Sequence, residues 1–303
     1  MARLHITHRT AYRYRKPVAF GEHRLMMRPR ESYDQHVIFA QLTVSPDASV
    51  RHVHDVFGNC VSIASFDRKA AELVFDSRVL LDHTPHPLAA ECDEAIHAST
   101  LSLPFAYDST DMPDLVRSVE RGFPDPDRVV DRWVRRFLKW NGPTLVLPLL
   151  AEMTRAIHAE FTYRQRLDGA AQSPLETLTL GSGTCRDFAV LMMEAARSLG
   201  LAAHFVSGYI YTPSSAGGGG AVHLGGGHTH AWVEVYLPSC GWVEFDPTNG
   251  LVGNRDLIRV AVVRDPKQAT PLWGSWTGGK ADYLGMEVEV ALTLEPELDR
   301  SVA

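Results

Sequence analysis

The stretch GSGTCRDFAVLMMEAARSLG, residues 181–200, decides the central element of the fold. Apolar side chains recur in it at helical spacing, which predicts a helix that begins near Cys185 and ends at Gly200. The predicted buried face consists of Ala189, Met192, Ala196 and Leu199. Gly181 and Gly183 let the chain turn sharply before the helix begins.

Cys185 lies where this helix begins. A thiol in the first turn is close to the positive end of the helix dipole and to N–H groups without an intrahelical acceptor. Both effects favour the thiolate, which is the nucleophilic form of cysteine. Taken alone, Cys185 is as consistent with a small cysteine buried in a helix, which is common in proteins.

Two β segments are predicted after the helix, THAWVEVYLP at 229–238 and GWVEFDPTNG at 241–250. If Tyr236 pairs with Trp242 in a hairpin, His230 and Asp246 are diagonal neighbours on one face. Diagonal neighbours are about 7–8 Å apart, a gap that carboxylate and imidazole side chains can bridge. A register shift of one residue would separate them. The alternative interpretations are an ordinary strand histidine for His230 and a turn residue for Asp246, which precedes Pro247.

In chain order, Cys185, His230 and Asp246 supply the nucleophile, base and orienting carboxylate of a catalytic triad. His230 would take the thiol proton and later give it to the leaving group, while Asp246 would fix the imidazole tautomer. The alternative is a metal site formed by His223, His228 and His230. We favour the triad because it accounts for Cys185 and Asp246 without a metal.

The rest of the chain divides by its periodicity. The predicted parts are a β-rich domain at 1–82, a connecting segment at 83–110, a catalytic core at 111–265 and a C-terminal tail with one strand at 266–303. Alternating side chains indicate the β domain, and Gly58-Asn59 is typical of a hairpin turn within it. His52 and His54 share one strand face there; without an evident third ligand we interpret them as surface histidines.

Two further helices and a glycine-rich loop are predicted in the core. Asp125-Pro126 indicates the cap and first position of a helix, which Asn141-Gly142-Pro143 would end. A second helix is predicted around Leu149, Met153 and Ile157. The glycine-rich residues 216–227, AGGGGAVHLGGG, precede His230 and predict a mobile loop at the cleft edge with a lid or substrate-entry role.

Composition narrows the class of protein. The 303 residues carry a formal net charge of -6, which argues against nucleic acid as the main partner. Eight Lys or Arg against one acid in residues 1–30 fit a solvated sheet face, or alternatively a docking face for an acidic partner. No apolar stretch is long enough to span a membrane and the start is unlike a signal peptide, so we expect a cytoplasmic protein.

The cysteines show no C-x-x-C spacing, which indicates neither a zinc site nor a redox dithiol. The four are Cys60, Cys92, Cys185 and Cys240. In a cytoplasmic protein they are expected to be free thiols.

The segments 181–200, 229–238 and 241–250 together resemble the three signature blocks of the transglutaminase-like superfamily. The resemblance implies an α+β fold with a papain-like core, in which a helix bearing the cysteine packs on an antiparallel sheet. Its catalytic residues correspond to Cys185, His230 and Asp246. The N-terminal block LHITHRTAYRYRKPVAFGEHRLMMRPR and the C-terminal MEVEVAL are similar to bacterial transglutaminase-like proteins, so the likeness extends over nearly the whole chain.

The same resemblance implies acyl transfer at an amide carbon through a thioester. Tyr163 corresponds to an aromatic residue that helps stabilise the oxyanion, beside the backbone N–H of Cys185. The expected partner is a peptide or protein substrate, and no cofactor is expected; the calcium of animal members has no matching acidic loop here. We favour hydrolysis of a peptide or isopeptide bond, with glutamine transamidation, deamidation or a non-catalytic peptide-binding module as alternatives.

Overall fold

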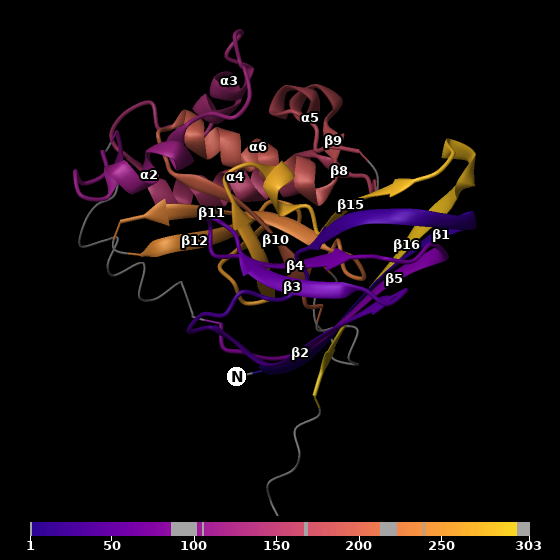
Figure 1. The fold of residues 1–303 in the computed structure, drawn as a ribbon. Helices are drawn as coiled ribbons and strands as arrows, with labels where there is room; N and C mark the ends of the chain where they lie inside the picture. The colour runs from indigo at the N-terminus through magenta and orange to yellow at the C-terminus, as the bar shows by residue number, and fades with distance from the viewer. Residues whose placement is uncertain are drawn as a thin grey trace, which may run out of the picture.

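A layer of helices, a central β-sheet and a second, N-terminal β-sheet are stacked on one another in the computed structural model (Figure 1). The structure describes residues 2–85, 102–104, 106–166, 169–212, 223–238 and 240–295. Within those ranges, none of the helices combines the length and the apolar character needed to cross a membrane. The α+β class that the family resemblance implies is confirmed.

The N-terminal sheet follows the strand order β2-β5-β1-β4-β3. Its strands are β1 (Ala2–Leu25), β2 (Gln35–Ser45), β3 (Ser49–His54), β4 (Cys60–Ser65) and β5 (Ala70–His83). Alternate side chains of β1 are buried, as its sequence pattern predicts. β3 and β4 form the predicted hairpin, and β15 (Leu272–Thr277) and β16 (Tyr283–Leu294) both pair antiparallel with β1.

The central sheet is antiparallel, with the order β13-β12-β11-β10-β14. Its strands are β10 (Ala203–Ile210), β11 (His230–Leu237), β12 (Gly241–Asp246), β13 (Leu251–Val252) and β14 (Leu257–Val263). The helices are α2 (Met112–Val119), α3 (Val129–Arg135), α4 (Val146–Glu160), α5 (Pro174–Leu180) and α6 (Cys185–Ser198). Short elements are β6 (Ser102–Leu103), β7 (Thr144–Leu145), β8 (Thr162–Tyr163), β9 (Ser182–Gly183) and the 3-10 turns η2 (Pro266–Ala269) and η3 (Lys280–Asp282).

The main hydrophobic core lies between the helices and one face of the central sheet. α6, the helix that carries Cys185, packs against β10 and β11. Its side chains Phe188, Leu191 and Met192 are completely or almost completely buried. A second apolar cluster joins the N-terminal sheet to Tyr209 of β10 and to Ile258 and Val260 of β14.

Polar anchors hold the two sheets together. Asn59, at the β3–β4 turn, exchanges two 2.9 Å hydrogen bonds with the backbone of Val262 in β14. Arg259 on β14 pairs with the buried Asp34 of the N-terminal region and with Glu244 on β12, the latter at 3.1 Å. These contacts fix how the N-terminal sheet sits on the core.

Two predictions about the chain need correction, and two helices were missed. The helix expected from Asp125-Pro126 to Asn141-Gly142-Pro143 begins only at Val129 and ends already at Arg135. The Asp125 carboxylate still accepts from the N–H groups of Val129 and Val130. The C-terminal tail carries two strands rather than one, and both belong to the N-terminal sheet. Helices α2 and α5 were not anticipated. Most of the predicted connecting segment, residues 86–101 and 105, lies outside the described residues.

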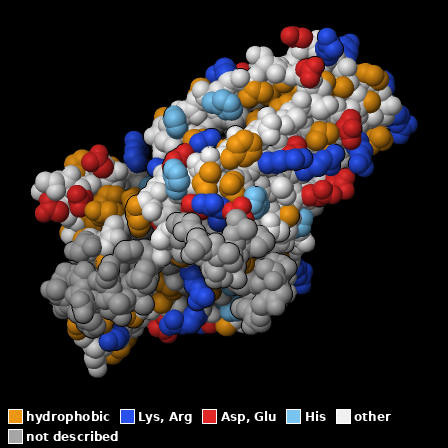
Figure 2. Space-filling model, turned by 90° about the horizontal axis from the view of Figure 1, so that it is seen from below, with side chains coloured by type: hydrophobic (Ala, Val, Ile, Leu, Met, Phe, Trp, Pro, Cys, Tyr) orange, Lys and Arg blue, Asp and Glu red, His pale blue; other side chains and the backbone are white. Residues whose placement is uncertain are grey.

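Two of the eight basic N-terminal residues pair with acids of neighbouring strands. Arg3 contacts Asp82 at 2.7 Å, and Arg13 contacts Glu287 at 3.2 Å. Figure 2 shows basic and acidic side chains interspersed on the face that it presents. The ion pairs of Arg3 and Arg13 neutralise part of the basic cluster.

Candidate active site

Cys185 is the first residue of α6 and is 7% exposed. The chain reaches it through β9, which pairs with β8. A Cβ on Gly183 would lie 2.8 Å from the Cβ of Asp187, so the close passage of the chain over the helix start requires glycine there. The thiol thus lies at the positive end of the helix, among N–H groups that lack intrahelical acceptors.

The buried carboxylate of Asp187 organises the start of α6. It accepts from the backbone N–H of Thr184 and of Gln172, both at 2.7 Å, and from the guanidinium of Arg166 at 3.0 Å. A carboxylate in the first turn also interacts favourably with the helix dipole. These bonds tie the loop before α5 to the helix start and hold the backbone around Cys185.

The pairing of β11 with β12 has the predicted register, because Tyr236 is opposite Trp242. His230 and Asp246 consequently share one face, and Nε2 of His230 is 2.8 Å from Oδ2 of Asp246. Asp246 also accepts from the N–H of Thr248 at 2.9 Å and from Nδ2 of Asn249 at 2.8 Å. His230 and Asp246 are 1% and 0% exposed, so the pair is completely enclosed in protein.

Charge interactions set the protonation of this pair. Burial disfavours the imidazolium, but the charges of Asp246 and Cys185 outweigh it and raise the pKa of His230 to about 10. Burial likewise disfavours the carboxylate, yet the His230 charge and the bonds from Asn249 and Thr248 lower the pKa of Asp246. At neutral pH the pair is therefore an imidazolium beside a carboxylate.

The second imidazole nitrogen of His230, Nδ1, is left for the thiol. It is buried and has no partner within hydrogen-bond geometry among the described residues, while Cys185 lines the same cavity and helps to raise the pKa of His230. Gly225 lies against the same edge of the ring, because a Cβ there would be 2.7 Å from Nδ1. Thiol–imidazole contacts often tighten only when substrate binds.

Tyr163 is brought to the same place by β8. Its ring is T-shaped against Phe188 in α6, with centroids 6.5 Å apart. Burial, followed by the negative charge of Cys185, raises the pKa of Tyr163 to about 12, so its phenol keeps its proton at neutral pH. The structure therefore brings together all four predicted site residues.

A cavity of about 620 Å³ joins these residues and is lined by Cys185, His230 and Tyr163. Its far wall is made by β1 and β16 of the N-terminal sheet, a contribution that the sequence reasoning missed. A separate hollow of about 740 Å³ lies within the N-terminal sheet and includes His52, His54 and Cys60. There His52 bonds to Ser62 and His54 contacts Cys60, away from the triad residues.

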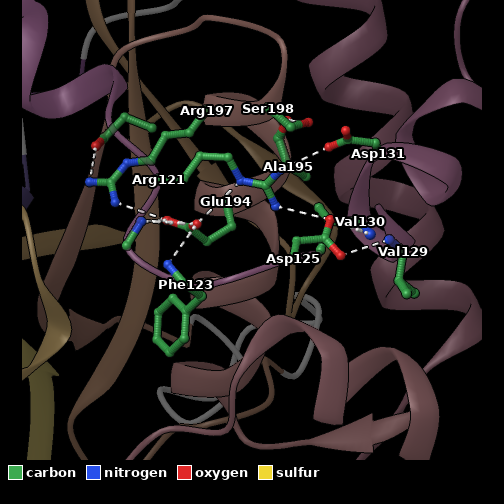
Figure 3. Close-up of polar contacts among 12 residues, drawn as sticks. Arg121, Phe123, Asp125, Val129, Val130, Asp131, Glu194, Ala195, Arg197 and Ser198 are labelled. Carbon is green, nitrogen blue, oxygen red and sulfur yellow. Dashed lines mark hydrogen bonds and ion pairs between the residues drawn. The ribbon is translucent and has the colours of Figure 1, made fainter. Parts of the chain in front are cut away.

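The buried Glu194 anchors the later part of α6. Its carboxylate accepts from the N–H groups of Gly122 and Phe123 and from Arg197, whose Nη1 is 3.0 Å away (Figure 3). Gly122 and Phe123 line the cavity beside Cys185. One helix thus carries the candidate nucleophile and holds a loop at the cavity edge. No signal in the sequence pattern indicated this, because Glu194 lies outside the predicted buried face of the helix.

The histidines considered as metal ligands have different partners. His223 contacts Asp256 at 3.0 Å, whereas His230 contacts Asp246. Within the described ranges, no three His, Cys, Asp or Glu side chains are grouped to hold a metal. Most of the predicted lid at 216–227 lies outside the described residues, because residues 213–222 are not among them. Cys92 lies outside them as well.

Comparison with known families gives two matches. Residues 4–82 match the bacterial transglutaminase-like N-terminal region, and residues 141–247 match the transglutaminase-like superfamily. An uncharacterized protein of Mycobacterium tuberculosis (strain ATCC 25618 / H37Rv) is 28% identical over 95% of this chain and 92% of its own length. An uncharacterized protein of Mycobacterium leprae (strain TN) is 26% identical, over 96% and 99%.

The fold has a counterpart among crystal structures. A proposed cysteine protease from Cytophaga hutchinsonii superposes with a TM-score of 0.67, over 96% of this chain and 90% of that one. The two sequences are 18% identical, so the likeness concerns the fold. The papain-like arrangement, with its N-terminal sheet, is shared along nearly the whole length of both chains.

Proposed function

Residues 141–247 belong to the transglutaminase-like superfamily and residues 4–82 form a bacterial transglutaminase-like N-terminal region, and from this premise we propose that the protein is a cysteine-nucleophile acyl-transfer enzyme that hydrolyses peptide or isopeptide bonds. The observation that carries the proposal is the enclosed His230–Asp246 pair next to Cys185 at a helix start. Three groups with complementary chemistry meet in one cavity.

The first half of the reaction uses the proton of the Cys185 thiol, which resides on His230. The sulfur attacks the carbonyl carbon, forms a C–S bond and pushes charge onto the carbonyl oxygen. The N–H of Cys185 and the hydroxyl of Tyr163 are the proposed donors to that oxygen. When the C–N bond breaks, Nδ1 of His230 gives its proton to the departing amine and a thioester remains.

The second half returns the enzyme to its starting state. Neutral His230 takes a proton from water while the water oxygen attacks the thioester carbon, and the C–S bond breaks. The products are a carboxylic acid, the Cys185 thiolate and the His230 imidazolium. Throughout, Asp246 holds Nε2–H, so that Nδ1 exchanges the proton with the reacting groups.

Hydrolysis is favoured over amine transfer because water needs no dedicated acceptor site. The test compares wild type with Cys185→Ala on a peptide library, read by mass spectrometry with and without a primary-amine probe. Cleavage by wild type alone supports hydrolysis. Cys185-dependent incorporation of the amine, or a gain of 1 Da at glutamine, would replace hydrolysis by transamidation or deamidation.

A non-catalytic peptide-binding module is separated from an enzyme by the reactivity of Cys185. Iodoacetamide at neutral pH should modify Cys185 rapidly, and His230→Ala should slow that modification. An inert Cys185 without turnover of any library member would overturn the proposal.

A further inference from the structure

We propose that the N-terminal sheet forms part of the substrate site, and that the face of β1 and β16 beside Cys185 selects a peptide with an apolar side chain near the reacting carbonyl. This inference rests on the proposed function and names the substrate class for the same site.

One face of the β1–β16 pair serves two purposes along its length. At one end, Leu4, Ile6 and Val290 pack in one apolar cluster with Tyr209, Ile258 and Val260 of the central sheet. Farther along the same face, Thr10 is opposite Val288 and Tyr12 is opposite Met286. These four side chains line the cavity that contains Cys185. Opposed residues of antiparallel strands share a face, so the docking surface continues directly into the cavity wall.

His8 marks the boundary between docking surface and cavity wall. It is 2% exposed and lies opposite Val290 in the strand pair. Its Nδ1 is 2.9 Å from the hydroxyl of Tyr209, which itself donates to the carbonyl of Met27. Burial lowers the pKa of His8 to about 4, so the imidazole is neutral at physiological pH. The wall is therefore fixed to the core and carries no charge at this point.

The chemistry of the wall indicates the ligand. Met286 and Val288 are partly buried and face a cavity that Phe205 and Leu272 also line. The charged lining residues come from elsewhere, namely Arg166, Glu176, Arg186, Asp265 and Lys267. Transfer of an apolar side chain from water to such a place is favourable. A charged side chain would lose its hydration there without an oppositely charged partner on this wall.

The alternation of β16 offers a matched control. Val288→Lys places a positive charge on the wall, whereas Ala291→Lys adds the same charge to the exposed face of the same strand. Both changes are made in the Cys185→Ala background, so that binding is measured whether or not the protein turns substrate over. The probes are fluorescent alanine-based pentapeptides that carry Leu, Phe, Glu or Lys at one scanned position, and binding is followed by anisotropy.

The Leu and Phe peptides should bind at least about tenfold more tightly than the Glu and Lys peptides to Cys185→Ala and to the Ala291→Lys control. Val288→Lys should abolish that preference and favour the Glu peptide. A melting temperature of Val288→Lys equal to that of the Ala291→Lys control excludes misfolding. If Val288→Lys does not fold, the smaller change Val288→Thr replaces it and should weaken the preference. Equal binding of all peptides, or a preference that survives Val288→Lys, would overturn the inference. Turnover by wild type tests the proposed function separately.

Discussion

Replacing Asp246 with Asn changes a single heavy atom and tests how the candidate triad works. One amide position can still accept from the N–H of Thr248, which lies 2.9 Å from Oδ1. The new NH2 takes the place of Oδ2, where it meets two donors at 2.8 Å, Nε2 of His230 and Nδ2 of Asn249. Both bonds are lost, and the bond to His230 returns only if the imidazole gives up its Nε2 proton, accepts from the new NH2 and keeps its remaining proton on Nδ1. Nδ1 could then no longer accept the thiol proton.

The expected loss of activity follows from that tautomer. In the serine-protease triad that serves as the general template, the same change lowers turnover by about 10⁴. A cysteine at a helix start needs less help from a base, so we expect a loss on the order of 10² to 10³ for Asp246→Asn. His230→Ala and Cys185→Ala should lose more, because each removes a reacting group.

The expected loss of stability follows from burial. A partly solvated site would tolerate Asp246→Asn with little change, but both partners are almost fully enclosed. Breaking one buried ion pair costs about 3–5 kcal/mol in comparable cases, and this is the loss expected near pH 6. Urea unfolding followed by tryptophan fluorescence measures it.

The pH dependence separates this loss from a packing defect. The folded pKa of His230 is above its ordinary 6.5, so its share of stability is complete below that pH and disappears as pH rises through about 10. The folded pKa of Asp246 is below its ordinary 3.8, so its share disappears as pH falls through that lowered value. Wild type and Asp246→Asn should therefore differ most between about pH 4 and pH 6.5 and converge toward both extremes. A difference that stays constant from below pH 3.8 to above pH 10, or full activity of Asp246→Asn, would refute the reasoning.

Three other substitutions or reactions test the surroundings of the site. Iodoacetamide at neutral pH should modify Cys185 faster than the more exposed Cys60, and equal rates measured by peptide mapping would contradict activation. Tyr163→Phe should lower kcat by about 10- to 100-fold with little change in KM; an unchanged kcat would mean that its hydroxyl does not bind the oxyanion. Glu194→Ala leaves the N–H of Gly122 and the guanidinium of Arg197 without their acceptor. It should lower the free energy of unfolding by about 3–5 kcal/mol in urea titrations. A loss below about 1 kcal/mol would show that other contacts hold the loop at Gly122.

Local patterns in the sequence determined the parts of the site that lie on single elements. The helix that begins at Cys185 follows from its glycines and its apolar spacing, and the structure confirms it. The hairpin register follows from the short connection after Leu237 and from alternation, which placed His230 and Asp246 on one face. Such signals act over a few residues, so they are readable without knowledge of the fold.

Only the tertiary structure decided which distant segments meet at the cavity. β16 pairs with β1 from the opposite end of the chain, and neither strand contains a signal that specifies the other. Alternation predicts that Val288 has a buried side, but not whether that side faces a core, a neighbouring sheet or a cavity with a cysteine in it. The burial of Asp246 was equally unreadable, because the layers that exclude water from it come from separate parts of the chain. Packing of one layer on another is a collective property of many weak contacts, and it therefore appears only once the whole fold is assembled.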